Sequence, residues 1–169
     1  MFPSLLVIYD SNVCVDEVHE VINALKSTFN VEIKKIEKFN IKASAYNSTR
    51  DQYDGQKLLN ILIDEQNLKF FLWILEDDLF VPNRNFVFGL GSKYYGAIVS
   101  FNRLESIEMK IKESIHETAH IFGLGHCTNF CVMQYSNSLA EALQKPSTLC
   151  NACQSKLKEN KKNFERNKD

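Results

Sequence analysis

The chain has 169 residues, of which 44% are hydrophobic and 24% are charged. This length predicts one compact domain, residues 1–169, that can bury a core without disulfide bonds. The formal net charge is only −1, so no overall field attracts nucleic acid or an anionic membrane, and we expect neither as a partner.

The beginning of the chain predicts a buried strand. Residues 4–9 form an apolar run, which is too short for the core of a signal peptide and has no basic residue before it. Nowhere does the chain reach the roughly 20 consecutive apolar residues that span a bilayer. We therefore expect a cytoplasmic protein, whose cysteine thiols stay reduced.

Residues 4–39 fit a strand–helix–strand unit. After the first strand, apolar residues recur at helical spacing (Val15, Val18, Val21, Ile22 and Leu25). Residues 31–39 then alternate like a partly exposed strand. Residues 40–50 are polar and small, which predicts a flexible loop.

A second helix and a central strand are expected next. The helix should begin at Asp51 or Asp54 and carry a cluster of apolar residues (Leu58, Leu59, Leu62 and Ile63). The fully apolar run at residues 70–75 predicts a central strand covered on both faces.

Two short strands follow at residues 86–90 and 97–100, on either side of a glycine-rich turn at 91–96. Together with the earlier elements they predict an α/β fold with a twisted, mixed sheet. Gly89 and Gly91 lack the third glycine and the following helix of a dinucleotide-binding loop, which excludes that motif.

Polar residues mark the ends of the neighbouring elements. Asp77 and Asp78 are interpreted as solvated carboxylates in a strand-end turn rather than as a cation site. Asn102 and Glu105 resemble a capping box that opens a long helix, which should end at Gly123. Six apolar residues form one face of this helix (Leu104, Ile107, Ile111, Ile115, Ala119 and Phe122).

Rare metal-binding side chains crowd into the last third of the chain. Three of the four histidines lie within eleven residues, and four of the five cysteines lie within the next twenty-seven. His116 and His120 are four residues apart on the predicted helix, so both imidazoles face one side and can hold one ion. Glu117 lies where it can reach a water molecule on that ion.

A third histidine completes this motif. His126 can reach the same ion only if the helix breaks at Gly123, with a positive φ angle that glycine tolerates. Three imidazoles leave one tetrahedral position open for water, as a catalytic zinc requires. The alternative is a helix that carries surface histidines by chance.

The full pattern at residues 116–126, H-E-x-x-H-x-x-G-x-x-H, resembles that of the metzincin metalloproteases. The sequence C-V-M at 131–133 and the sequence C-N-A-C at 150–153 make it similar to the archaemetzincins in particular. Residues 78–82 and 85–89 also resemble the segment that this family carries before its active-site helix. Both cysteine loops are one residue shorter than the family pattern, which leaves the ligand set intact.

The resemblance implies a single compact metzincin-like domain with an active-site helix. Residues 1–122 would form the sheet and helices, and residues 123–160 would form a carboxy-terminal part stapled by zinc. Residues 156–169, rich in Lys, Asn and Glu, are expected to be a short helix that frays into a flexible tail at 161–169, with a basic docking segment as the alternative.

The resemblance also assigns roles to individual residues. It implies that the three histidines of the motif (His116, His120 and His126) bind the catalytic zinc. Glu117 would be the general base, and Met133 would pack in a turn beneath the metal without binding it. The alternative for Met133 is an ordinary core methionine.

The cysteines predict a second metal site. Four of them form a C-x3-C plus C-x2-C set that matches tetrahedral thiolate ligation of zinc (Cys127, Cys131, Cys150 and Cys153). The alternatives are reduced cysteines without metal and a redox disulfide between Cys150 and Cys153. Four thiolates close the coordination sphere, so this zinc would be structural, which makes two zinc ions per chain. Cys14 is expected to be a buried or half-buried thiol without a role.

Together these features predict a zinc-dependent metalloprotease that acts on peptide or protein substrates as a monomer. By resemblance, an extended substrate would add to an edge strand containing Phe86, Val87 and Phe88, although an interior strand is an open alternative. Tyr135 could stabilise the oxyanion or could simply pack. The competing functions are hydrolysis of a non-peptide amide and a non-catalytic, zinc-stabilised interaction module.

Overall fold

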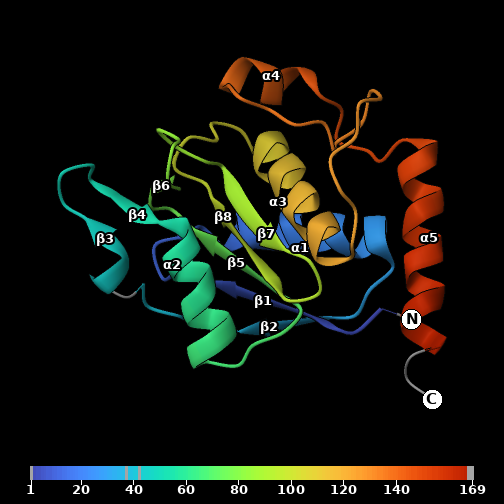
Figure 1. Ribbon diagram of the computed structural model, residues 1–169, viewed down its shortest axis with the longest axis horizontal. Coiled ribbons are helices and arrows are strands. Elements are labelled where there is room, and N and C mark those ends of the chain that lie inside the picture. The colour runs from blue at the N-terminus through green and yellow to red at the C-terminus, as the bar shows by residue number, and fades with distance from the viewer. Residues whose placement is uncertain (1, 37, 42, 167–169) are drawn as a thin grey trace.

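A five-stranded sheet forms the centre of the protein in the computed structural model, which describes residues 2–36, 38–41 and 43–166 (Figure 1). Its strands lie in the order β2 (Ile33–Ile36), β1 (Leu5–Tyr9), β5 (Phe71–Leu75), β8 (Gly96–Ser100) and β7 (Gly89–Ser92). All neighbours are parallel except β7, which runs antiparallel to β8. The predicted mixed sheet is confirmed, with β7 at its edge.

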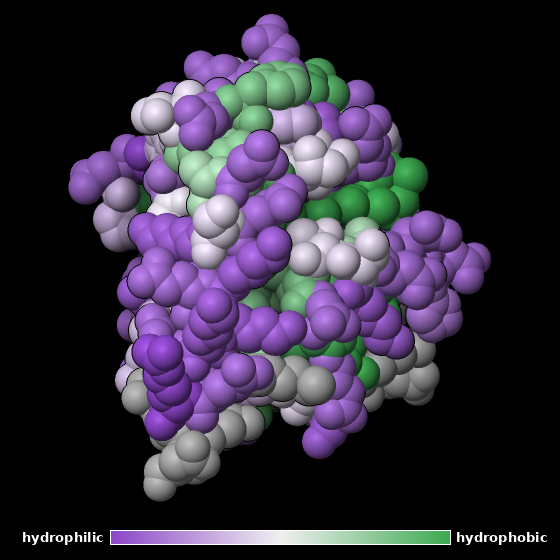
Figure 2. Space-filling model, turned by 90° about the vertical axis from the view of Figure 1, so that its right-hand side faces the viewer, coloured by the Kyte–Doolittle hydropathy of each residue, from purple (hydrophilic) through white to green (hydrophobic). Residues whose placement is uncertain are grey.

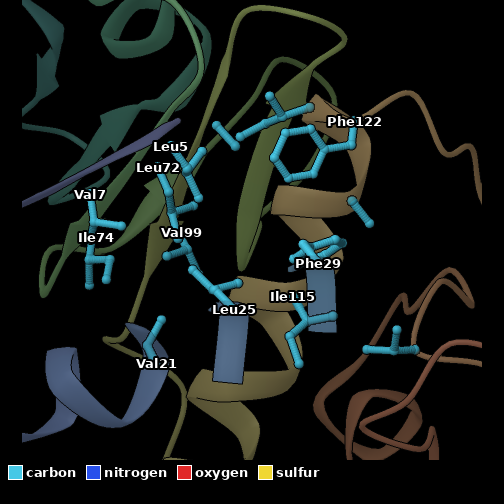
Figure 3. Packing of buried hydrophobic residues seen from close by; sticks show 14 of the residues in the cluster. Leu5, Val7, Val21, Leu25, Phe29, Leu72, Ile74, Val99, Ile115 and Phe122 are labelled. Carbon is cyan, nitrogen blue, oxygen red and sulfur yellow. The ribbon is translucent and has the colours of Figure 1, made fainter. Parts of the chain in front are cut away.

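Helices cover both faces of the sheet. On β5, Leu72 and Ile74 point to the core shared with α1 (Val15–Phe29) and α3 (Ile107–Ile121), whereas Phe71 and Trp73 point to the opposite core. Figure 3 shows strand and helix side chains meeting in the first core (Leu5, Val7, Val21, Leu25, Phe29, Leu72, Ile74, Val99, Ile115 and Phe122). This two-sided burial explains the continuous apolar run of β5.

The second core lies beneath α2 (Gly55–Asn60), which continues as a single π-helical turn, η2 (Ile61–Glu65). Of the two predicted starts, Asp54 is the one that caps the helix, because its side chain accepts hydrogen bonds from the backbone N–H groups of Gln56 and Lys57.

The predicted flexible loop at 40–50 is partly ordered into secondary structure, which corrects the expectation. A 3₁₀ turn, η1 (Ala43–Ala45), leads into β3 (Tyr46–Asn47), which pairs antiparallel with β4 (Gln52–Asp54). In turn, β4 pairs with β6 (Leu79–Phe80), a strand that the sequence analysis did not predict. In this second sheet β3 and β4 pair locally, whereas β6 joins β4 from a distant part of the chain.

The predicted strand at 86–90 is displaced along the chain. The structure begins β7 at Gly89, and Val87 makes only an isolated bridge with Leu79. The turn before β8 is correspondingly shorter, with Tyr94 at a φ of 66°. The apolar character of residues 86–88 reflects burial beside β6 and α3 rather than a regular strand, so the expected boundary was wrong.

The long helix begins later than predicted. Its N-cap is Ser106, whose hydroxyl accepts a hydrogen bond from the backbone N–H of Met109 at 3.3 Å; the expected capping box at Asn102 was wrong. Consequently Ile107 lies in the exposed first turn and not in the core. The expected break is confirmed, because Gly123 has a φ of +87°.

The carboxy-terminal part contains α4 (Leu139–Gln144) and α5 (Asn151–Arg166). The expected flexible tail is wrong for residues 161–166, because α5 continues through them and Phe164 packs against the rings of Phe2, Phe70 and Tyr94. Residues 167–169 lie outside the described part. Figure 2 views the molecule from the α5 side and shows a largely hydrophilic face.

Two further observations concern residues outside the core. Cys14 is exposed, which corrects the expectation of a buried or half-buried thiol; as the N-cap of α1, it lies where the chain leaves the sheet. No helix within the described residues is long and apolar enough to cross a membrane.

Candidate functional site

Three histidines converge where α3 ends. The ligand atoms of His116, His120 and His126 all lie within 4.8 Å of one another. The Nε2 atoms of His116 and His120 are 3.1 Å apart, close to the ~3.3 Å expected for two nitrogens bound tetrahedrally to one zinc ion. This donor set therefore fits a three-histidine metal site.

Backbone carbonyls orient two of these rings. The Nδ1 atom of His116 donates to the carbonyl of Val132 at 2.9 Å, and that of His120 donates to the carbonyl of Leu124 at 2.8 Å. Because Nδ1 holds the proton in each ring, Nε2 keeps a lone pair that can bind a metal ion. Burial lowers the pKa of all three histidines. The pKa of His116 falls furthest, well below the usual range of a histidine. The neutral imidazoles favoured in this way are the form that binds a metal ion.

Glu117 lies next to this centre in a confined position. Its side chain is buried, and Oε2 makes no hydrogen bond among the described residues. Burial raises the pKa of Glu117 well above its usual range; the nearby Glu113 carboxylate raises it further, whereas the Lys145 ammonium lowers it. A buried carboxylate of raised pKa holds a proton more readily than an exposed one, which suits a group that accepts and returns a proton.

Edge strand β7 runs close beside α3 because two of its residues are glycine. A β-carbon on Gly89 would lie 2.6 Å from Cγ of Glu117, and one on Gly91 would lie 2.9 Å from Cβ of His120. From the sequence, Gly89 was expected in a strand and Gly91 in a turn, and neither was expected to pack against the helix. The structure shows that they permit close backbone approach.

A buried ion pair extends the site along α3. Lys145, which follows α4, places Nζ 2.7 Å from Oε1 of Glu113. The Lys145 side chain is 2% exposed and that of Glu113 is 5% exposed. Neither residue was singled out from the sequence. Glu113 precedes Glu117 by four residues, a signal that could have placed it on the same helix face.

Met133 lies in the segment that supports the histidines. It is fully buried, and its carbonyl accepts a hydrogen bond from the backbone N–H of Cys127 at 2.9 Å. The preceding residue, Val132, is the one that orients His116. The position therefore agrees with a packing role for Met133.

The four cysteines of the predicted second site also come together. Their Sγ atoms all lie within 4.8 Å of one another, and those of Cys127 and Cys150 are 3.8 Å apart. Two sulfurs bound tetrahedrally to one zinc ion should be ~3.8 Å apart. Every cysteine is a free thiol, so the structure contains no disulfide between Cys150 and Cys153.

Hydrogen bonds prepare this cluster to hold thiolates. Backbone N–H groups of Cys150 and Met133 lie at 3.3 and 3.5 Å from Cys131 Sγ, and the Asn129 amide lies 3.6 Å from Cys150 Sγ. A hydrogen bond from the Cys153 backbone chiefly lowers the pKa of Cys150 to about 6, whereas burial raises the pKa of Cys131 and that of Cys153. The donor set therefore fits a four-thiolate zinc site.

The histidines and Glu117 line a pocket of about 340 Å³ between β7 and the segment after Met133. Phe86, Val87 and Phe88 line it too, although only the following residues form the edge strand. Tyr135 projects into it with its ring centroid 4.9 Å from that of His126, and the guanidinium of Arg84 lies 5.0 Å from the Tyr135 centroid. The sequence analysis missed Arg84, which precedes the predicted strand in a polar turn.

Of the two aspartates after β5, Asp78 is engaged by other side chains. Both oxygens of Asp78 bind Arg103, at 2.8 and 2.7 Å, and Gln52 donates to the same carboxylate at 2.8 Å. These bonds lower the pKa of Asp78, although burial opposes them. Asp78 is thus an ion-paired turn residue rather than a freely solvated carboxylate.

Comparison with known proteins identifies the family. The profile of Peptidase family M54 matches residues 7–159. The archaemetzincin of Nanoarchaeum equitans is 42% identical over 133 residues, which cover 79% of this chain and 78% of the relative. The archaemetzincin of Archaeoglobus fulgidus is 33% identical over 150 residues, covering 83% of this chain and 91% of the relative.

Solved structures agree with this assignment. The crystal structure of the A. fulgidus archaemetzincin complexed with malonate matches with a TM-score of 0.81 and 32% identity, covering 89% of this chain and 98% of that one. The archaemetzincin of Methanopyrus kandleri matches with a TM-score of 0.82 and 30% identity, covering 96% and 99%. The chain therefore belongs to peptidase family M54, the archaemetzincins, and is a hydrolase of the zinc metallopeptidase class.

Proposed function

We propose that the protein hydrolyses peptide bonds at the three-histidine centre, with Glu117 as general base. The observation that carries this proposal is the convergence of three metal-binding imidazoles beside a buried carboxylate that is not itself a ligand. A zinc ion bound there would supply a Lewis acid that activates water and polarises the scissile carbonyl. His116, His120 and His126 would hold it.

Glu117 would take a proton from the attacking water and deliver it to the leaving amine. Its unpartnered Oε2 supports this role, because a buried carboxylate oxygen without a hydrogen-bond donor costs stability. A purely structural zinc module would gain nothing from keeping such a group. This argues against the non-catalytic alternative.

The substrate would lie extended in the pocket and pair with edge strand β7. The antiparallel β7–β8 pairing leaves the other edge of β7 available for a further strand, and the pocket runs along that edge. The cysteine cluster would hold a second, structural zinc ion that fixes the segment carrying Met133.

A Glu117→Gln variant tests the proposal, together with metal analysis and a peptide-library assay. We expect two zinc ions per chain in both proteins and cleavage only in the native one. The exposed Glu20, replaced by Gln, is the matched control and should cleave normally. Equal cleavage by Glu117→Gln and native protein would overturn the mechanism. Cleavage of simple amides but of no peptide would favour the non-peptide alternative.

A further inference from the structure

The pocket contains polar groups that the hydrolytic mechanism does not use. It extends from the histidines past Glu117 to Glu113 and Lys145. Glu113 is four residues before Glu117 on α3, which places it about 6 Å farther along the helix axis. This distance is within reach of a substrate side chain next to the scissile bond.

The ion pair at this position is costly unless something else binds to it. Both side chains are at least 95% buried, and removing two charges from water costs more than an apolar pair of similar size. The ammonium group of Lys145 has three N–H donors. Among the described residues, Lys145 Nζ lies 2.7 Å from Glu113 Oε1, but Oε1 makes no hydrogen bond, so the contact is an ion pair without hydrogen-bond geometry. The ammonium donors of Lys145 and the Oε1 acceptor of Glu113 are therefore both available to hydrogen-bond a bound molecule.

The charges of the pair restrict which side chain fits. A carboxylate would be attracted by Lys145 but repelled by the Glu113 carboxylate. An ammonium would be attracted by Glu113 but repelled by Lys145. An apolar side chain would leave the donors unpaired. A carboxamide is neutral, accepts from Lys145 through its oxygen and donates to Glu113 through its nitrogen. It is the side-chain group that complements both members.

We propose that Glu113 and Lys145 form a specificity subsite that selects a carboxamide side chain, Gln or Asn, next to the scissile bond. The inference rests on the proposed function, since it places the scissile bond beside Glu117. A hydrogen bond between α3 and α4 holds the pocket wall beside the ion pair, which supports a rigid subsite. Lys112 Nζ donates to the carbonyl of Leu143 at 3.1 Å, which ties α4 to α3 beside the ion pair.

Binding can be measured separately from catalysis. The probes are peptide hydroxamates whose residue next to the hydroxamate group is Gln, Glu, Lys or Leu. Each probe is titrated into the zinc-loaded protein in a calorimeter. In native protein the Gln probe should bind about tenfold more tightly than each of the others, since two hydrogen bonds to charged groups distinguish it. Equal binding of the Gln and Leu probes would overturn the proposal.

Variants test whether the ion pair causes the preference. Lys145→Met should bind the Lys probe about tenfold more tightly than native protein does. Glu113→Gln should bind the Glu probe about tenfold more tightly than native protein does. The exchanged pair, Glu113→Lys with Lys145→Glu, keeps both charges and should retain the preference for Gln. This double variant and Glu113→Gln carry the test if Lys145→Met does not fold. An unchanged ranking in Glu113→Gln, or loss of the Gln preference in the exchanged pair, would refute the proposal.

Peptide cleavage separates this inference from the proposed function. If native protein cleaves peptides but does not favour Gln or Asn at either side of the cleaved bond, the subsite is wrong and the peptidase function stands. If the hydroxamates rank as expected and no peptide is cleaved, the subsite stands and the peptidase function is wrong.

Discussion

Gly89 on the edge strand packs directly against Glu117 on the active-site helix: a β-carbon at Gly89 would lie 2.6 Å from Cγ of Glu117 and 2.8 Å from the carbonyl oxygen of Ile98. No side chain fits this gap without moving either the proposed general base or the strand pair. The same glycine thus sets the width of the cleft and the position of the Glu117 carboxylate.

Replacing Gly89 by Ala should therefore damage both stability and activity. We expect the free energy of unfolding to fall by roughly 1–3 kcal/mol, as for other overpacked sites, and kcat/KM for peptide cleavage to fall at least tenfold. Urea unfolding and steady-state kinetics measure the two effects. Gly125→Ala is the matched control, because a β-carbon there would meet nothing within 4 Å. A Gly89→Ala protein with native kinetics would show that the close contact is not needed for catalysis.

The cysteine cluster should support the histidine centre through the backbone. Cys127 directly follows His126, and its N–H binds the carbonyl of Met133 at 2.9 Å. We expect Cys150→Ser to lose the structural zinc and also to weaken the catalytic zinc, so that metal analysis after dialysis gives fewer than one ion per chain.

Cys14→Ser controls for the loss of a thiol, because Cys14 is exposed and outside the cluster. It should retain two zinc ions and native activity. A Cys150→Ser protein that keeps one tightly bound zinc ion and full activity would disprove the coupling between the two sites.

Tyr135 offers a test of oxyanion stabilisation. Its side chain is 41% exposed and lies in the pocket against His126, a position that favours a role in the reaction over ordinary core packing. Tyr135→Phe should lower kcat by roughly 100- to 1,000-fold, because one hydrogen-bond donor to the developing charge is lost. KM and the zinc content should change little. An unchanged turnover number would assign Tyr135 to packing alone.

The convergence of the three histidines could be predicted because their geometry is local. Residues four apart on a helix share a face, and a helix break at Gly123 returns the next histidine to that face. The α/β alternation could also be read from the apolar pattern of strands such as β5, which is buried on both faces.

The remaining features depend on contacts between distant parts of the chain. Gly89 and Gly91 have low strand propensity, yet pairing with β8 and close packing on α3 place them in β7. Lys145 appears in the sequence as one more charged residue near a helix end. Only the fold brings it to Glu113, so its burial has no local sequence signal.

The burial of Asp10 predicts that stability depends on pH. Asp10 belongs to neither of the two proposed metal sites. It is 6% exposed, and burial raises its pKa from 3.8 to about 6, although a hydrogen bond from Trp73 Nε1 at 3.0 Å opposes the shift and Asp77 adds to it. The folded state therefore binds more protons than the unfolded state between these values, so the free energy of unfolding falls as the pH rises from about 4 to 6. At neutral pH the ionised carboxylate costs roughly 3 kcal/mol.

Asp10→Asn should remove this cost while keeping an oxygen that accepts from Trp73. The variant should be more stable than the native protein at neutral pH, and its advantage should grow by roughly 1 kcal/mol between pH 5 and pH 7.5. Urea unfolding of both proteins across this range measures the difference in their free energy of unfolding. Any pH response of the metal sites is common to both proteins and cancels in this difference. Asp64→Asn, at an exposed position, controls for the loss of one carboxylate. A stability difference between Asp10→Asn and native protein that stays constant from pH 5 to pH 7.5 would show that Asp10 does not titrate in this range.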